Sequence, residues 1–215
     1  MNRILLVDDH ATLREPVAFM FEREPEFAMV AQAGSLAEAR GMLDDLDVAV
    51  IDLDLPDGNG EELIKDFHIA NPRGTALVLT AAADRRVHAR AIEAGAAGIL
   101  HKSVRVKEVV DAVRCLLAGE ELLSPNETVE LLRLASRERE QNYEAQRAIA
   151  RLTPREREVL QALADGLRDK DIAHKLQVGS GTIRNHVASI LGKLDVQSRL
   201  QALVFAVRHG ATRID

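Results

Sequence analysis

Short apolar runs alternate with longer amphipathic segments along the first 120 residues. The runs predict strands, because four or five consecutive apolar residues bounded by polar residues are typical of strands buried on both faces of a sheet. The predicted strands span residues 3–7, 28–32, 48–51, 76–80 and 97–101, and the predicted helices span residues 11–23, 36–46, 60–70, 84–94 and 104–118. This alternation predicts an α/β domain with a five-stranded, parallel, doubly wound sheet covered by helices on both faces.

The pattern changes at Ser124, where helix-forming residues become continuous and β-branched residues almost disappear. We therefore expect residues 121–150 to form a helical linker. Residues 151–215 then read as four short helices, and the first of them opens on "TPRE", in which Thr153, Pro154 and Glu156 form a capping box with proline at the first helical position. The expected organisation is an α/β domain over residues 1–120, the linker over 121–150 and an all-α domain over 151–215.

The second and third of these short helices, in "DKDIAHKLQVGSGTIRNHVASILGKL", are joined by a tight turn, which predicts a helix-turn-helix. In the third helix the apolar residues fall on one stripe, Ile183, Val187, Ile190, Leu191 and Leu194. The residues that face away from it are Thr182, Arg184, Asn185, Ala188, Ser189 and Lys193. Such a face could read base edges through Arg and Asn and hold the DNA backbone through Thr, Ser and Lys. The alternative is an ordinary solvated helix face.

Charge is divided unevenly along the chain. The whole sequence has 28 Lys/Arg and 34 Asp/Glu, a net charge of −6. Residues 1–123 contain 13 Lys/Arg and 22 Asp/Glu, a charge of −9, whereas residues 151–215 contain 11 and 7, a charge of +4. This asymmetry indicates an acidic module joined to a basic module, and the basic module could bind phosphate groups.

Polar side chains lie where the predicted strands end. Asp8 and Asp9 follow the first strand, Asp52 the third, Thr80 ends the fourth and Lys102 follows the fifth. Ligands bind at this edge of a parallel sheet. Because carboxylates that converge there repel each other by about 4 kcal/mol per pair at 4 Å and an effective dielectric constant of about 20, we expect Asp8, Asp9 and Asp52 to bind Mg²⁺. Beside Mg²⁺, a lysine and a hydroxyl, Asp52 could accept a phosphoryl group as a nucleophile.

The stretches "LLVDDH", "VIDLDLPDGNG", "LTAA" and "GILHKS" resemble the motifs of two-component receiver domains, in the same order across residues 1 to about 120. The resemblance implies a flavodoxin-like fold, Mg²⁺ bound by Asp8, Asp9 and Asp52, and phosphorylation of Asp52 by a sensor histidine kinase, with Thr80 and Lys102 contacting the phosphoryl group. Receivers usually have Tyr or Phe three residues before the lysine. Here that position is Ile99, so activation is expected to use movement of the loop at Thr80 without an aromatic switch.

The stretch from Leu152 to Ala206 is similar to the LuxR-type DNA-binding domain, and the combination with a receiver is that of the NarL/FixJ class of response regulators. The resemblance implies DNA-facing positions at Arg184, Asn185, Ala188 and Lys193, and a last helix that pairs two modules as a homodimer on double-stranded DNA. Three residues depart from the family pattern. Arg168 and Asp169 stand where Ser-Asn is usual, and Gly179 replaces a capping serine, a change that costs only a few tenths of a kcal/mol.

Two alternatives to a phosphorylated receiver are open. The Asp52 and Asp54 pair resembles the Asp-x-Asp of haloacid-dehalogenase-type phosphatases, although that family places it on the first strand and here Asp8 and Asp9 precede it. The other alternative is a receiver that acts by protein contacts and is never phosphorylated, which Ile99 favours. Turnover of a phosphate monoester would indicate the phosphatase, and Mg²⁺-dependent labelling would reject the unphosphorylated receiver.

The remaining features suggest a cytoplasmic protein without a membrane partner. No apolar run approaches the length of a membrane span, and the first acids follow only four apolar residues after Arg3, too soon for a signal peptide. The single cysteine, Cys115, lies in an apolar helical pattern, so we expect an inert, packed thiol. His101 and His186 have no second ligand at a matching spacing, so neither metal binding nor pH sensing is expected of them.

Overall fold

The computed structural model describes residues 1–213, with the side chain of residue 29 excepted, so the last two residues of the expected 151–215 domain lie outside it. Contacts divide the chain into two compact units, Met1–Ser136 and Arg137–Asp215. Among residues 1–213, no helix is both long enough and apolar enough to cross a membrane.

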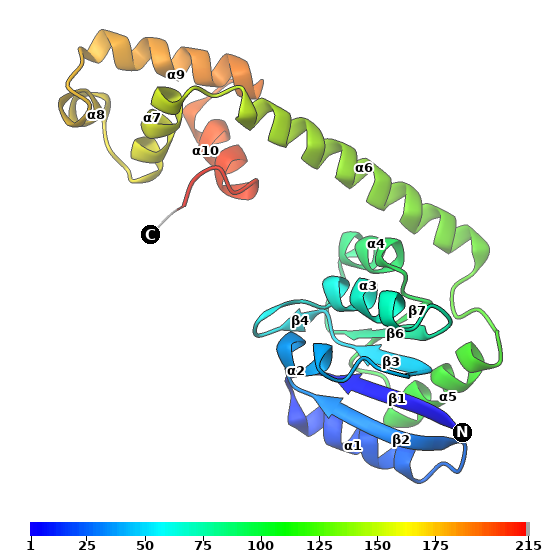
Figure 1. Ribbon diagram of the computed structural model, residues 1–215. Coiled ribbons are helices and arrows are strands. Elements are labelled where there is room, and N and C mark those ends of the chain that lie inside the picture. Colours follow the sequence, from blue (N-terminus) through cyan, green and yellow to red (C-terminus); the bar gives the residue numbers. More distant parts are fainter. Residues whose placement is uncertain (214–215) are drawn as a thin grey trace. The chain divides into compact units, whose positions relative to one another are not determined.

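The first unit contains a parallel sheet, as the alternating pattern predicts, and within the described residues it has five strands in the order β2-β1-β3-β6-β7. Helices α1 and α5 cover one face, and α2, α3 and α4 cover the other (Figure 1). The strands are β1 (Asn2–Val7), β2 (Phe27–Ala33), β3 (Val48–Ile51), β6 (Thr75–Thr80) and β7 (Gly98–His101). The helices are α1 (Ala11–Glu22), α2 (Leu36–Arg40), α3 (Gly60–Ala70), α4 (Arg85–Ala94) and α5 (Val106–Leu117).

The apolar runs form strands here because both faces of the sheet are covered. All four residues of β3 are buried, and they alternate between two cores. Ala49 and Ile51 pack with α2, α3 and α4, whereas Val48 and Val50 pack with α1 and α5. Continuous apolar strands are expected in a sheet of this kind, because neither face meets water.

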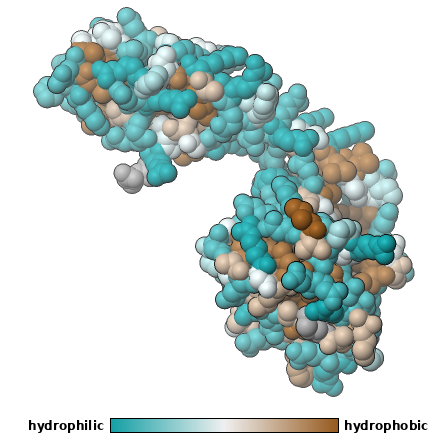
Figure 2. All heavy atoms as spheres, in the orientation of Figure 1, coloured by the Kyte–Doolittle hydropathy of each residue, from teal (hydrophilic) through white to brown (hydrophobic). Residues whose placement is uncertain are grey.

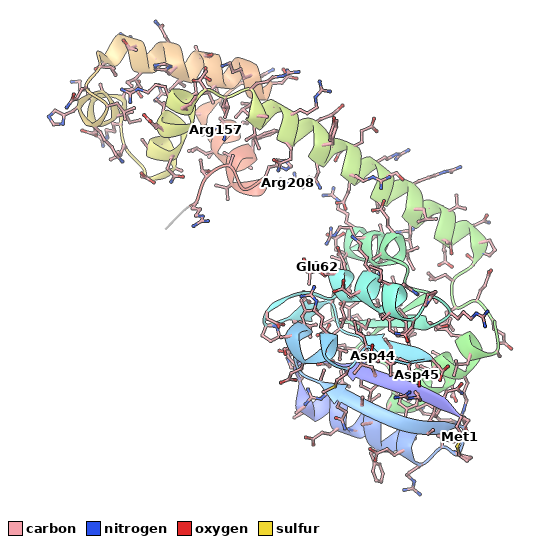
Figure 3. The ribbon with its side chains drawn as sticks, viewed as in Figure 1. Met1, Asp44, Asp45, Glu62, Arg157 and Arg208 are labelled. Carbon is pink, nitrogen blue, oxygen red and sulfur yellow. The ribbon has the colours of Figure 1, made fainter. Side chains whose placement is uncertain are left out.

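Helix α2 is shorter than predicted, because it ends at Arg40 rather than at residue 46. The backbone that follows α2 is instead bound by the side chain of Asn71, which lies at the end of α3. Its Oδ1 accepts the N–H of Leu46 at 2.8 Å, and its Nδ2 donates to the carbonyl of Leu43 at 2.7 Å. This segment contains Asp45, which adopts a left-handed conformation and is labelled in Figure 3. The helical prediction for residues 41–46 was therefore wrong.

A small antiparallel hairpin, β4 (Asp54–Leu55) and β5 (Gly58–Asn59), was not predicted. It follows the third strand of the sequence and leads into α3. The side chain of Asn59 caps α3 by accepting the N–H of Glu61 at 2.9 Å. The hairpin thus sets the path of the chain between Asp52 and α3.

The predicted linker forms one helix, α6 (Pro125–Ala150). Four helices follow it within residues 151–213, as the caps and stops predict: α7 (Pro154–Ala164), α8 (Asp169–Lys175), α9 (Ser180–Leu194) and α10 (Arg199–Arg208). Thr153 and Glu156 form the expected capping box at the start of α7. The apolar stripe of α9 is confirmed, with Ile183, Val187, Ile190 and Leu194 buried and Leu191 half-buried.

Hydrophilic residues dominate the face of the molecule that Figure 2 shows.

Candidate functional site

The carboxyl ends of neighbouring strands bring the predicted residues of the first unit together. The N–H of Asp52, just after β3, donates to the carbonyl of Val7 at the end of β1, 2.8 Å away. The N–H of Lys102, just after β7, donates to the carbonyl of Thr80 at the end of β6, 2.9 Å away. These backbone bonds align the ends of the strands, so that Asp8, Asp52, Thr80 and Lys102 lie at one edge of the sheet.

Lys102 joins two of the three predicted carboxylates. Its Nζ lies 2.7 Å from Asp52 Oδ2 and 2.8 Å from Asp8 Oδ2. Asp52 is only 2% exposed, and this burial raises its pKa, an effect that the hydrogen bond from Lys102 only partly offsets. Burial disfavours the Lys102 ammonium as well, but the hydrogen bonds to Asp52 and Asp8 outweigh it and raise the lysine's pKa. A single lysine therefore does not fully compensate the buried acids.

The third predicted carboxylate, Asp9, lies beside the other two. Ligand atoms of Asp8, Asp9, His10 and Asp52 all lie within 4.8 Å of one another. His10 Nδ1 is 2.6 Å from Asp9 Oδ1, and the N–H of His10 donates to Asp8 Oδ1 at 2.8 Å. The three carboxylates supply the hard oxygen ligands that Mg²⁺ prefers, so the residues present fit that ion. Sequence reasoning did not include His10 in this cluster, although it directly follows the acidic pair.

Thr80 is fully buried at the end of β6. Its Oγ1 accepts the N–H of Ala82, 3.1 Å away, so the hydroxyl is tied to the loop that leads to α4. Ile99, which stands where receivers usually have an aromatic residue, is half-buried and packs against the core under α3 and α4.

Two residues that sequence reasoning gave little or no role hold the segment after Asp52. Gly60 approaches the Asp52 backbone so closely that a Cβ on it would lie 2.1 Å from the Asp52 carbonyl oxygen. The carboxylate of Asp57 accepts the N–H groups of Leu36 and Ala37 at 2.8 and 2.9 Å, and these bonds lower its pKa. The segment after Asp52 is therefore fixed to the start of both α2 and α3. Both residues lie in the stretch "VIDLDLPDGNG", which resembles a receiver motif, but their contacts were not predicted from the sequence.

In the second unit, α8 and α9 form the two helices of the predicted helix-turn-helix, with α9 as its second helix. The outward face of α9 exposes Thr182, Arg184, Asn185 and Ala188. The helix begins after Gly179, which has no side chain with which to cap it.

Ser189 and Lys193 have a partner within the unit. Ser189 Oγ donates to Glu156 Oε1 at 2.6 Å, and Lys193 Nζ lies 2.9 and 2.6 Å from the two oxygens of the same carboxylate. Glu156 is 4% exposed and also accepts the N–H of Thr153. Burial opposes its charge, but the bonds from Lys193, Ser189 and Thr153 prevail and lower its pKa to about 2. This network joins α7 to α9.

Asp169, one of the departures from the LuxR-type pattern, also has a structural partner. Its two carboxylate oxygens accept hydrogen bonds from the Arg199 guanidinium at 2.5 and 2.8 Å. This bidentate pair joins the first residue of α8 to the first residue of α10. The bond from Arg199 lowers the pKa of Asp169, and the charge of Arg184 contributes in the same direction. The aspartate therefore fits its position as the partner of an arginine.

Family models match both units. Residues 4–114 match the response regulator receiver domain, and residues 150–206 match the bacterial regulatory proteins of the luxR family. The two matches together cover most of the chain in the order that the sequence motifs indicate. No such order is expected of a haloacid-dehalogenase-type phosphatase, so the alternative based on Asp52 and Asp54 finds no support.

Similar proteins share both parts of the chain. It is 36% identical over 211 residues to the DNA-binding transcriptional activator DevR/DosR of Mycobacterium tuberculosis. This match covers 96% of this chain and 94% of that protein. It is 34% identical over 218 residues to the transcriptional regulatory protein LnrK of Bacillus subtilis, covering 99% of each.

Solved structures are similar to this chain as well. A two-component response regulator of the LuxR family from Aurantimonas sp. SI85-9A1 is 33% identical, with a TM-score of 0.53, and the match covers 65% of this chain and 98% of that one. RcsB of Salmonella enterica serovar Typhimurium, bound to promoter rprA in the presence of phosphomimetic BeF3−, has a TM-score of 0.52 over 95% of this chain and 98% of its own. At 24% identity, RcsB shows the shared fold alone.

Proposed function

The chain belongs to the two-component response regulators that join a receiver domain to a LuxR-type DNA-binding domain, and we propose that Asp52 is its phosphoacceptor. It is thus a phosphorylation-regulated, DNA-binding transcriptional regulator and not an enzyme. We further propose that residues 1–120 are the receiver, residues 121–150 the linker and residues 151–215 the DNA-binding domain.

The single observation that carries the proposal for Asp52 is its place between Lys102 and the acidic pair, where it is almost fully buried. In the proposed step an Asp52 carboxylate oxygen forms a bond to phosphorus, and the bond from phosphorus to the donor breaks. With a histidine kinase the donor atom is a phosphohistidine nitrogen, and with acetyl phosphate it is an oxygen that leaves with the electron pair as acetate. Lys102 would neutralise the transferred oxygens, and the Thr80 hydroxyl would donate to one of them.

Asp8, Asp9 and Asp52 would hold Mg²⁺ through their carboxylate oxygens. When bound, the ion supplies positive charge to the phosphoryl oxygens. His10 contacts both acids of the pair and would keep their loop in place. We propose a cytoplasmic location for the protein, because the proposed kinase partner and the proposed DNA target would be reached there.

The test is mass spectrometry of the purified protein after incubation with acetyl phosphate and Mg²⁺. We expect a mass gain of one phosphoryl group in the wild-type protein and none in Asp52→Asn, which keeps the shape of the side chain. Asp54→Asn is the matched control, because this exposed carboxylate lies only two residues away, and it should still be labelled. Labelling that persists in Asp52→Asn, or an unlabelled wild type, would overturn the assignment.

For the second unit we propose that Thr182, Arg184, Asn185 and Ala188 face the DNA major groove. Their support is that all four are exposed on α9, whose opposite stripe is buried. Ser189 and Lys193 were predicted to contact DNA as well, and both bind Glu156. We propose that Lys193 contacts the DNA backbone with the N–H groups that Glu156 leaves free, and that Ser189, which is also exposed, lies on the same DNA-facing side. In a gel shift, Arg184→Ala should weaken specific binding, whereas Arg133→Ala on α6, which removes the same charge, should not. Equal binding by both variants would contradict the assigned face.

We also propose that α10 pairs two copies of the chain on DNA. Leu200, Val204 and Val207 are 71%, 59% and 40% exposed, and their spacing places them on one face of the helix. Two linked modules bind DNA more tightly than one module of modest charge. Val204→Glu should therefore weaken cooperative binding to paired half-sites while leaving binding to a single half-site unchanged, and equal loss on both kinds of site would contradict a role in pairing.

A further inference from the structure

The loop that links β6 to α4, residues 81–84, follows Thr80 directly and is held by two histidines. His101 Nε2 lies 3.1 Å from the carbonyl oxygen of Ala81, and His88 Nε2 lies 2.8 Å from the carbonyl oxygen of Ala82. Because a carbonyl oxygen can only accept, each Nε2 must carry the hydrogen of its bond. Two successive peptide groups after Thr80 are therefore fixed from outside the loop.

The first of these peptide groups also binds Thr80. Its carbonyl, from Ala81, accepts from His101, and its N–H, from Ala82, donates to Thr80 Oγ1 at 3.1 Å. A trans peptide is planar, with its C=O and N–H pointing in opposite directions, so a bond at one end fixes the direction of the other. His101 thus acts on the Thr80 hydroxyl through one rigid group.

The ring of His101 is itself oriented by Ser103. Its Nδ1 lies 2.7 Å from Ser103 Oγ and accepts the N–H of Ser103 at 3.2 Å. Nδ1 is therefore the acceptor of the ring and Nε2 its donor, which is the tautomer that the Ala81 carbonyl requires. His101 is also the residue before Lys102, so its backbone is anchored next to the lysine that contacts Asp52.

We propose that His101 is a positioning residue for phosphoryl transfer to Asp52, and that it acts by orienting the Thr80 hydroxyl through the Ala81–Ala82 peptide. This rests on the proposed roles of Asp52 and Thr80. A hydroxyl that accepts the Ala82 N–H keeps its own hydrogen for a phosphoryl oxygen. The side chain of Ile99 has no polar atom that could bond that hydroxyl, whereas His101 holds the peptide to which the hydroxyl is bonded.

The test is the rate at which Asp52 is labelled by acetyl phosphate in the presence of Mg²⁺, in the full-length protein. His101→Leu should lower the rate roughly two- to tenfold, the size expected for one net hydrogen bond. His101→Gln can present an amide N–H to the Ala81 carbonyl and should restore most of the rate. His68→Leu is the matched control, because His68 bonds the Gly95 carbonyl at 2.9 Å in the same manner at the far end of α3 and α4, and it should leave the rate unchanged.

A double-mutant cycle separates positioning from a general loss of stability. If His101 acts only through Thr80, then Thr80→Ala combined with His101→Leu should be no slower than Thr80→Ala alone. Multiplying effects would overturn the proposal, as would an unchanged rate in His101→Leu. An unlabelled wild-type protein would instead overturn the role of Asp52, so the two failures are distinguishable.

A second readout needs no phosphoryl donor. The Ala82 amide is protected by its bond to Thr80 Oγ1, and the orientation of its peptide depends on His101. Hydrogen exchange at Ala82, followed by NMR, should be several-fold faster in His101→Leu than in the wild type. It should return towards the wild-type rate in His101→Gln and stay unchanged in His68→Leu. Equal exchange in His101→Leu and the wild type would contradict the proposed restraint.

Discussion

Lys193 Nζ contacts both carboxylate oxygens of Glu156, at 2.9 and 2.6 Å, across the interface between α9 and α7. Because Glu156 is buried, its charge depends on this partner together with the bonds from Ser189 and Thr153. The pair therefore fixes α9, the helix that carries the proposed DNA-facing residues, to α7.

We expect Glu156→Gln to lower the free energy of unfolding of the second unit by about 1–3 kcal/mol, since it removes the buried negative charge that pairs with Lys193. Glu158→Gln on the same helix is the control. Its pair with Arg155 is exposed, and such pairs contribute at most about 1 kcal/mol. Urea unfolding of both variants measures the difference. Equal losses would show that the Glu156 network stabilises the second unit no more than an exposed ion pair does.

The same carboxylate predicts a pH dependence. Its pKa is about 2 in the folded protein, below the ordinary value of 4.5. The stabilisation it provides is therefore complete above pH 4.5 and is lost as the pH falls from 4.5 towards 2. The shift corresponds to at most about 3 kcal/mol. Unfolding measured across this range should show a steeper loss for the wild type than for Glu156→Gln, and parallel curves would argue against the assigned pKa.

Gly60 provides a test of how the phosphoacceptor is held. Gly60→Ala would place a Cβ 2.1 Å from the Asp52 carbonyl oxygen, so the backbone must shift. We expect a loss of about 1–3 kcal/mol in the free energy of unfolding, together with slower labelling of Asp52 by acetyl phosphate. Gly41→Ala is the control, since its Cβ would meet only the Glu38 carbonyl at 3.4 Å and its φ is −73°. Wild-type stability and labelling in Gly60→Ala would contradict the close approach.

The sequence was sufficient to predict most of the fold and the acidic site, because both depend on local patterns. Strands, helices and capping boxes follow from neighbouring residues, and the carboxyl ends of parallel strands bring Asp8, Asp52 and Lys102 to one edge without knowledge of side-chain packing. The end of α2 could not be predicted in this way, because Asn71 lies 25 residues from Leu46 in sequence.

The polar face of α9 shows the same limit. Helical periodicity places Ser189 and Lys193 away from the apolar stripe, but it does not show that α7 brings Glu156 within reach of both. The role of His101 had no signal in the motif either, because its contact with Ala81 depends on how β6 and β7 end beside each other. Long-range polar contacts are thus where pattern-based reasoning stopped.

The start of α6 belongs to the first unit, which leads to a prediction about the linker. Leu131 and Ala135 are 5% and 1% exposed and pack into the core under α3 and α4, and Arg85 of α4 pairs with Glu130 at 3.0 Å. We expect Leu131→Ala to lower the free energy of unfolding of the first unit by about 2–5 kcal/mol, because it leaves a cavity in that core.

Leu132→Ala is the matched control for this prediction. Leu132 is the next residue of the same helix but is 41% exposed, so its truncation should cost less than about 1 kcal/mol. Urea unfolding followed by a probe in the first unit measures both variants. If Leu131→Ala and Leu132→Ala lower the free energy of unfolding equally, the beginning of α6 is not part of that core. If only Leu131 matters, the beginning of α6 is part of the core that contains α3 and α4.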